Sequence, residues 1–231
     1  MTNLEICFSP VQWRALDVER LRASACAVID VIRATSTIVT ALAHGASGVQ
    51  PVAAVADAFA AKARDTGALL AGERGGQALP GFDLGNSPED FTTGRVQGRP
   101  IILTTTNGTQ ALAACQGARA IVTLSFLNLD AVAARLREIG PPWIIACAGH
   151  EGEFGVDDAA VAGALAEALG QEHALVSLYR SVRTELPEML LGSAAGQELL
   201  KVGMEKDVPF CAQLNLFSIV PTLGADGVMR G

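Results

Sequence analysis

The chain has 231 residues, half of them hydrophobic and only 18% charged. That balance excludes intrinsic disorder, and no apolar run reaches the roughly 18 to 20 residues of a membrane span. The formal net charge of −7 argues against a nucleic-acid partner, because binding the phosphate backbone requires a basic surface. The N-terminus lacks a charged segment with a cleavage site. We therefore expect a cytoplasmic protein with a single domain over residues 1–231.

Short β-rich runs alternate with alanine-rich helical stretches along the chain. The expected strands cover residues 4–8, 25–32, 48–52, 68–71, 101–105, 120–124 and 143–146. The expected helices cover residues 36–43, 55–64, 110–115, 129–139 and 158–169, and weaker patterns predict helices near 172–181 and 193–202 and an apolar run over 214–220. This alternation predicts βαβ units and a three-layer α/β/α fold around a largely parallel or mixed sheet.

Chemistry is expected directly after the strands, because ligands of such sheets collect beyond the carboxyl ends of the strands. The turn around residues 30–36 holds Asp30, Arg33, Thr35 and Ser36. Free N–H groups at a helix start suit an anion, Arg33 adds a fork of donors, and Asp30 could hold a divalent cation. The structural alternative is that Thr35 or Ser36 only caps the helix, while Asp30 pairs with Arg33.

A long glycine-rich loop follows the strand expected at 68–71. Its polar residues are Glu73, Arg74, Asp83, Asn86 and Ser87. Loops of this kind in compact chains are usually functional, and glycines allow the backbone to approach a ligand closely. The alternative is an ordinary surface loop carrying a Glu73–Arg74 charge pair.

Hydroxyl and amide groups follow the strand at 101–105. The residues are Thr106, Asn107, Gly108 and Thr109, at the start of a predicted helix. We expect an anion-binding turn there, and the alternative is a threonine-rich strand end followed by an Asn-Gly turn.

Acidic residues follow the strand at 143–146. They are Glu151, Glu153, Asp157 and Asp158. Oxygen-rich sites suit Mg²⁺, although acids at a helix start are also favoured by the helix dipole alone. His150 has no second histidine nearby, which argues against zinc.

Together the four segments combine oxyanion donors with ligands for a hard cation, the pairing that phosphoryl chemistry requires. They resemble the 2-phosphosulfolactate phosphatase family, the phosphohydrolase of coenzyme M biosynthesis. The matching stretches are VIDVIRATSTIVTAL, GERGG with PGFDLGNSP, TTTNGT, and CAG-x-x-G-x-F-x-x-D-D-x-x-x-AG, and a weaker match in the tail includes D-V-P. One departure is Asp157, where the family usually has Glu.

The resemblance implies a homodimeric, Mg²⁺-dependent enzyme that hydrolyses 2-phospho-3-sulfolactate, a small phosphorylated organic acid, to 3-sulfolactate and inorganic phosphate. The catalytic residues would be Asp30, Arg33, Glu153 and Asp158, and Mg²⁺ would be held by some of Asp30, Glu153, Asp157 and Asp158. Substrate contacts would come from Thr35, Ser36, Glu73, Arg74, Asp83, Asn86, Ser87, Thr106, Asn107, Gly108 and Thr109.

Two alternatives remain open at this point. Asp30 could act as a nucleophile through an aspartyl-phosphate instead of assisting direct attack by water. The chain could also be a non-catalytic binding module for a phosphorylated or sulfonated acid. A nucleotide-dependent enzyme is disfavoured, because neither a GxGxxG turn after the first strands nor a GxxxxGK[ST] loop occurs.

Overall fold

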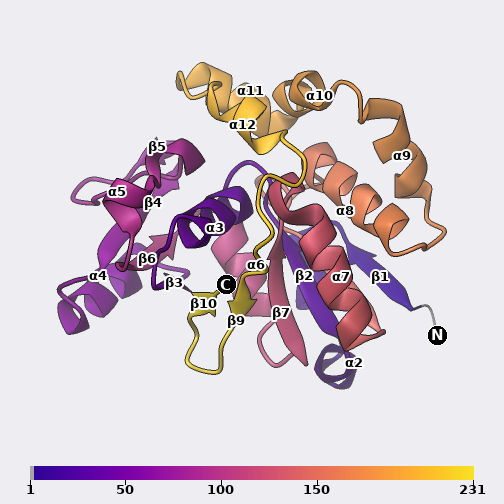
Figure 1. Cartoon of the computed structure of the whole chain (residues 1–231), viewed down its shortest axis with the longest axis horizontal. Helices are drawn as coiled ribbons and strands as arrows, with labels where there is room; N and C mark the ends of the chain where they lie inside the picture. The colour runs from indigo at the N-terminus through magenta and orange to yellow at the C-terminus, as the bar shows by residue number, and fades with distance from the viewer. Residues whose placement is uncertain (1–2) are drawn as a thin grey trace.

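A mixed sheet of ten strands organises the computed structural model, which describes residues 3–231 (Figure 1). Met1 and Thr2, the start of the predicted domain, lie outside the described residues. The strands are β1 (Leu4–Cys7), β2 (Ala25–Ile29), β3 (Gly48–Pro51), β4 (Leu69–Arg74), β5 (Gln77–Ala78), β6 (Pro100–Thr104), β7 (Ala120–Leu124), β8 (Trp143–Cys147), β9 (Thr222–Leu223) and β10 (Met229–Arg230). Their order in the sheet is β1-β8-β2-β7-β9-β10-β3-β6-β4-β5.

Helices connect most of the strands. They are α1 (Pro10–Arg14), α2 (Val18–Ala23), α3 (Ala34–Ala43), α4 (Val55–Arg64), α5 (Thr93–Val96), α6 (Gly108–Ala114), α7 (Leu129–Ile139), α8 (Val156–Ala168), α9 (Ala174–Val182), α10 (Leu186–Gly192), α11 (Ala194–Lys201) and α12 (Asp207–Cys211), with 3₁₀ turns at Pro88–Asp90 and Phe126–Asn128. Within residues 3–231, no helix is long and apolar enough to cross a membrane.

The sheet consists of two parallel groups that a C-terminal hairpin joins. Strands β1, β8, β2 and β7 run parallel to one another, as do β3, β6 and β4. Strands β9 and β10 lie between these groups and pair antiparallel with both. The predicted three-layer fold around a mixed, mostly parallel sheet is confirmed.

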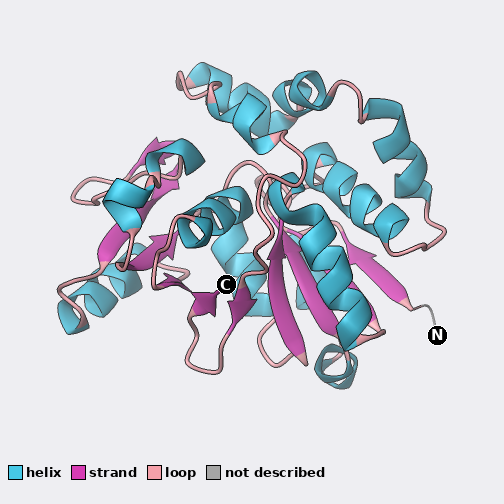
Figure 2. Ribbon diagram, in the orientation of Figure 1, coloured by secondary structure: helices cyan, strands magenta, loops and turns pink. Residues whose placement is uncertain are grey.

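Alternate residues of each strand face different layers, as the pleat requires. In β2, Ala27 and Ile29 pack in the cluster that contains the buried residues of α7 and α8, whereas Cys26 and Val28 pack with α3 and α6. In the other group, Leu70 packs against α4. Figure 2 shows helices on both sides of the strands, so the sheet is covered on both faces and its strands read as continuous apolar runs.

Local sequence signals account for the longer helices. In α7, Val132 and Leu136 are fully buried, and the helix stops at Gly140, whose φ is +79°. In α8, a Cβ on Gly163 would lie 2.1 Å from the carbonyl oxygen of Leu175. The glycine therefore lets the following helix α9 pack directly against α8.

The structure corrects two of the predicted boundaries. The strand expected over 25–32 ends at Ile29, so the residues from 30 onward form the turn before α3. The strand expected over 68–71 extends to Arg74 and pairs with the short strand β5. The apolar run 214–220 forms neither helix nor strand.

The carboxyl ends of the two parallel groups of strands meet at one site. They do so although three antiparallel pairings, β7 with β9, β9 with β10 and β10 with β3, separate the groups in the sheet. Each of those pairings joins only one or two residue pairs, so the two groups can lie at a large angle to each other. A Cβ on Gly108, after β6, would lie 2.7 Å from Oδ2 of Asp30, after β2. The N–H of Thr106 donates to Oε1 of Glu73, in β4, over 2.8 Å. These contacts close the site described next.

Candidate active site

A cavity of about 110 Å³ lies where the four polar turns meet. Its lining includes six of the residues predicted to act in catalysis or to bind substrate or metal, namely Asp30, Arg33, Glu73, Asn86, Thr106 and Asn107. The remaining lining includes His150 and Glu151 after β8, and Glu198 of α11. The turns after β2, β4, β6 and β8 thus contribute to one site, together with a helix from the C-terminal part of the chain.

Asp30 is buried at the cavity wall, with 8% of its surface exposed. Its Oδ1 accepts the N–H of Ala34 over 3.3 Å, and the N–H of Gly108 also donates to the carboxylate. Burial, followed by the charge of Glu73, raises the pKa of Asp30 to about 7. A carboxyl group with such a pKa can exchange a proton near neutral pH.

Thr35 and Ser36 stabilise the turn instead of lining the cavity. The hydroxyl of Thr35 donates to the carbonyl oxygen of Asp30 over 2.9 Å and accepts the N–H of Asp30 over 3.1 Å. The hydroxyl of Ser36 donates to the carbonyl oxygen of Val31 over 2.8 Å. Neither residue is the helix cap that the sequence left open, because the N-cap position of α3 is Arg33.

Asp158 joins two of the turns from behind the cavity. Its Oδ1 accepts the N–H of Val31 over 2.9 Å, and its Oδ2 accepts the N–H of Gly149 over 3.0 Å. Burial, and then the charges of Asp157 and Asp30, raise the pKa of Asp158, and burial raises the pKa of Asp157 as well. Neither acid is part of the cavity lining.

The four acids expected to bind metal do not come together as a set. Glu153 is exposed and lies off the cavity lining, where its backbone pairs with that of His150. Asp30 is thus the one member of the set that faces the cavity. In the part of the chain described, no three His, Cys, Asp or Glu side chains gather in a way that could hold a metal ion.

Glu73 connects two turns across the cavity. Its Oε1 accepts the N–H of Thr106 over 2.8 Å and the Thr106 hydroxyl over 3.1 Å, and its Oε2 accepts the N–H of Gly76 over 3.0 Å. Nearby, Asn86 lines the cavity, is 4% exposed, and has a buried Oδ1 without a hydrogen-bond partner among the described residues. A buried acceptor in that state indicates a ligand or water site.

Arg33 is buried and paired, but not with Asp30. Its Nη1 donates to Oδ2 of Asp207 over 2.6 Å, and its Nη2 donates to the carbonyl oxygen of Gly76 over 2.6 Å. The hydroxyl of Ser87 donates to the other oxygen of Asp207, also over 2.6 Å. The Asp30–Arg33 pair that the sequence left open is therefore wrong. The one available signal for Asp207 was the D-V-P match in the tail.

Three other residues predicted to bind substrate make contacts within the protein instead. Arg74 donates to the carbonyl oxygen of Glu73 over 2.6 Å and to the Thr104 hydroxyl over 3.0 Å, so the Glu73–Arg74 charge pair of the alternative reading does not form between these side chains. Asp83 is exposed and accepts the N–H of Leu70 over 2.8 Å. Thr109 is buried within the first turn of α6. None of these three is part of the cavity lining.

Of two further contributors to the cavity, Glu198 carried no sequence signal, whereas Glu151 belongs to the acidic set that follows the strand at 143–146. Oε2 of Glu198, in α11, lies 3.2 Å from Nε2 of His150. Glu151 has a φ of +49°, an uncommon backbone conformation for a residue other than glycine. The lining as a whole carries four carboxylates against one arginine and one histidine.

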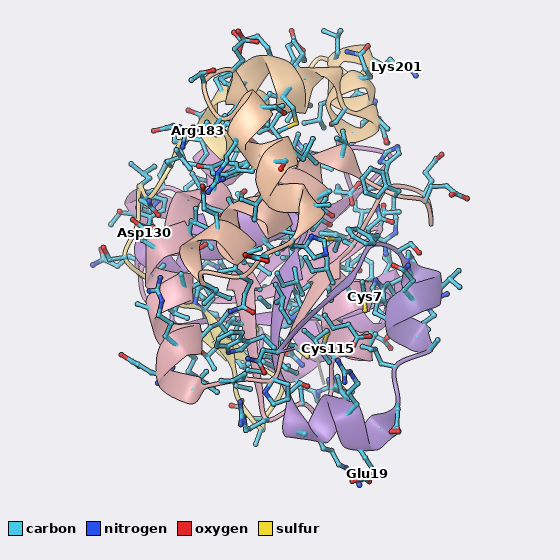
Figure 3. The ribbon with its side chains drawn as sticks, turned by 90° about the vertical axis from the view of Figure 1, so that its right-hand side faces the viewer. Cys7, Glu19, Cys115, Asp130, Arg183 and Lys201 are labelled. Carbon is cyan, nitrogen blue, oxygen red and sulfur yellow. The ribbon has the colours of Figure 1, made fainter. Side chains whose placement is uncertain are left out.

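The cysteines offer no nucleophile in the cavity. All five are unpaired and buried, and Cys7 and Cys115 are labelled within the ribbon in Figure 3. Burial raises the pKa of Cys7 and of Cys211 to about 12, which disfavours the thiolate.

Comparison with known proteins places this chain in a family. A family model described as 2-phosphosulpholactate phosphatase matches residues 14–226. A protein of Thermotoga petrophila named probable 2-phosphosulfolactate phosphatase is 43% identical over 202 residues, covering 85% of this chain and 87% of that protein. Proteins with the same name from Carboxydothermus hydrogenoformans (84% of each chain) and Symbiobacterium thermophilum (88% of this chain, 92% of that protein) are each 40% identical. The chain therefore belongs to the 2-phosphosulfolactate phosphatase family, as the four motifs predicted.

Proposed function

We propose that this protein hydrolyses 2-phospho-3-sulfolactate to 3-sulfolactate and inorganic phosphate, and that it does so with Mg²⁺. The family to which the chain belongs consists of phosphoric monoester hydrolases, and the names of its relatives supply the substrate. The observation that carries the proposal is the cavity itself, where Asp30, Arg33 and the turn at Thr106 and Asn107 face one space.

The charge of the cavity supports the need for a cation. Four carboxylates line it, and the charge of its one arginine is balanced by Asp207. A substrate with phosphate, carboxylate and sulfonate groups is strongly anionic, and like charges repel strongly where water is partly excluded. A divalent cation removes this conflict because it attracts both the cavity acids and the substrate oxygens.

The residues that face the cavity fit Mg²⁺ as an ion with few protein ligands. Mg²⁺ usually keeps several waters and takes one or two carboxylates together with substrate phosphate oxygens. Asp30 and the unpartnered Oδ1 of Asn86 are the donors that would hold it. When bound, such an ion supplies Lewis-acid polarisation of the phosphoryl group.

The protein's own groups account for the rest of the proposed chemistry. Arg33 would offset negative charge on the phosphoryl oxygens, as charge-assisted donors do. In direct hydrolysis, a water oxygen attacks phosphorus, the ester P–O bond breaks, and Asp30 accepts the proton of the water while the leaving alkoxide takes a proton from solvent. The alternative is attack by Asp30 itself, followed by hydrolysis of the acyl phosphate.

Phosphate release from 2-phosphosulfolactate tests the function, measured with Mg²⁺ and with excess chelator. We expect turnover that needs the metal and falls to background in Asp30→Asn. Equal rates in chelator would contradict the metal role, and tight binding of the substrate without release would instead favour the binding module. Acid quenching during turnover, followed by mass spectrometry of the peptide with Asp30, distinguishes an aspartyl-phosphate from direct hydrolysis.

Two further predictions concern the protein as a whole. A homodimer and a cytoplasmic location remain expectations from the resemblance and the composition. Light scattering on the purified protein and fractionation of the producing cell test them directly.

A further inference from the structure

A buried ion pair connects helix α12 to the one arginine among the described residues that line the cavity. Arg33 Nη1 lies 2.6 Å from Asp207 Oδ2, and the two side chains are 2% and 0% exposed. The other terminal nitrogen of Arg33 donates to the carbonyl oxygen of Gly76 over 2.6 Å. A planar guanidinium held at both terminal nitrogens has a defined orientation, because its donors form a rigid fork.

The same carboxylate also holds a second wall of the cavity. Oδ1 of Asp207 accepts the hydroxyl of Ser87 over 2.6 Å, and Ser87 follows Asn86, whose buried Oδ1 has no partner among the described residues. The hydroxyl of Thr37 fixes the backbone of Asn86, donating to its carbonyl oxygen over 2.9 Å. One aspartate thus connects the turn after β2 with the loop before residue 88.

Stability alone does not explain a buried pair at this place. Removing two charges from water is costly, and well-packed apolar residues of similar volume are often at least as stabilising. A guanidinium has five N–H donors, of which Asp207 and Gly76 occupy two, and Arg33 lines the cavity. Donors that are already oriented toward developing charge contribute strongly to catalysis.

We propose that Asp207, with Ser87 as its second anchor, is a positioning residue that acts through Arg33 to orient the guanidinium for the transferred phosphoryl group. The inference rests on the proposed function, and it gives α12 a role in the site that no predicted residue covered. Because Asp207 makes its contacts with Arg33 and Ser87, its removal changes the rate of reaction through Arg33 more than it changes the affinity for substrate.

A double-mutant cycle tests this role. Asn replaces Asp207 with the same shape but carries no charge and has one acceptor oxygen in place of two, so it cannot accept from both Ser87 and Arg33. We expect Asp207→Asn to lower kcat by about 30- to 100-fold, with KM changed less than about threefold. The double variant Arg33→Gln/Asp207→Asn should be no slower than Arg33→Gln. Asp226→Asn is the matched control, because Asp226 forms a 2.6 Å pair with Arg230 at the exposed surface.

Chemical rescue provides a second readout. Added guanidinium ion should restore at least about tenfold in kcat to Arg33→Ala, and should restore nothing to Arg33→Ala/Asp207→Asn. Should Asp207→Asn not fold, Ser87→Ala replaces it, with an expected loss of about three- to tenfold in kcat at unchanged KM. Equal rescue in both backgrounds, multiplicative losses in the cycle, or a folded Asp207→Asn with kcat within about twofold of wild type would each overturn the proposal.

The design separates this inference from the proposed function. Absence of phosphate release by the wild-type protein contradicts the function alone. The cycle is then measured as calorimetric binding of inorganic phosphate, where Asp207→Asn should weaken binding by up to about threefold, and only when Arg33 is present. Independent, additive effects on phosphate affinity would overturn the positioning role.

Discussion

Asp30→Asn should make the ligand-free protein more stable at alkaline pH while abolishing its activity. Asp30 is buried beside Glu73, and its pKa rises from the ordinary 3.8 to about 7. The folded state therefore holds a proton on Asp30 over a pH range in which the unfolded chain has already released it. By linkage, this group's contribution is fully present below about pH 4 and is lost as the pH rises through 7.

The magnitude follows from the difference between the two pKa values. At about 1.36 kcal/mol per pKa unit, ionising Asp30 in the folded state costs up to about 4 kcal/mol above pH 7. Asn removes that cost but keeps one acceptor for the two backbone donors, Ala34 and Gly108. The lost hydrogen bond costs about 1 kcal/mol, so we expect a net gain of about 1 to 3 kcal/mol at pH 8.5 and none near pH 4.

Urea unfolding at pH 4.5 and 8.5, without divalent ions, measures this difference. The free energy of unfolding of the wild type should fall between these two pH values more steeply than that of Asp30→Asn. Asp57→Asn, at an exposed position in the first turn of α4, serves as the control and should follow the wild type. Adding Mg²⁺ at pH 8.5 should stabilise the wild type and leave Asp30→Asn unchanged. Identical pH slopes for wild type and Asp30→Asn would refute the reasoning.

Three further predictions concern the cavity and its surroundings. Gly108→Ala should cost about 1 to 3 kcal/mol of stability and at least about tenfold in kcat, because its Cβ would lie 2.7 Å from Asp30 Oδ2. Gly94→Ala is the control, because the space around Gly94 is open, and it should change neither stability nor kcat. Thermal unfolding and steady-state kinetics measure both effects. Glu73→Gln should lower the pKa of Asp30 and move the acidic limb of the kcat/KM profile to lower pH, and an unmoved limb would contradict the coupling. Glu153→Gln should keep kcat within about threefold of wild type, because Glu153 lies off the cavity, and a large loss would restore its predicted catalytic role.

The sequence was sufficient for features that depend on local pattern. The helix predicted over residues 129–139 appears in the structure with the same bounds, as α7. The turns that carry Asp30 and Asn107 follow strands in the structure, as the alternation of strands and helices predicted, whereas Glu73 lies within the last residues of strand β4. Periodicity, capping and turn chemistry involve residues within a few positions of one another, so a single sequence contains them.

Only the tertiary structure decided which of those side chains face the cavity. Arg33 pairs with Asp207, which is 174 residues away, and not with its neighbour Asp30. The hairpin that joins the two parallel groups depends on Thr222 pairing with Val122, and its two-residue strands are too short for a periodic signal. Residue type and spacing determined that carboxylates, hydroxyls and an arginine stand after the strands. Their direction, burial and partners arise from contacts between distant segments, which the local sequence does not contain.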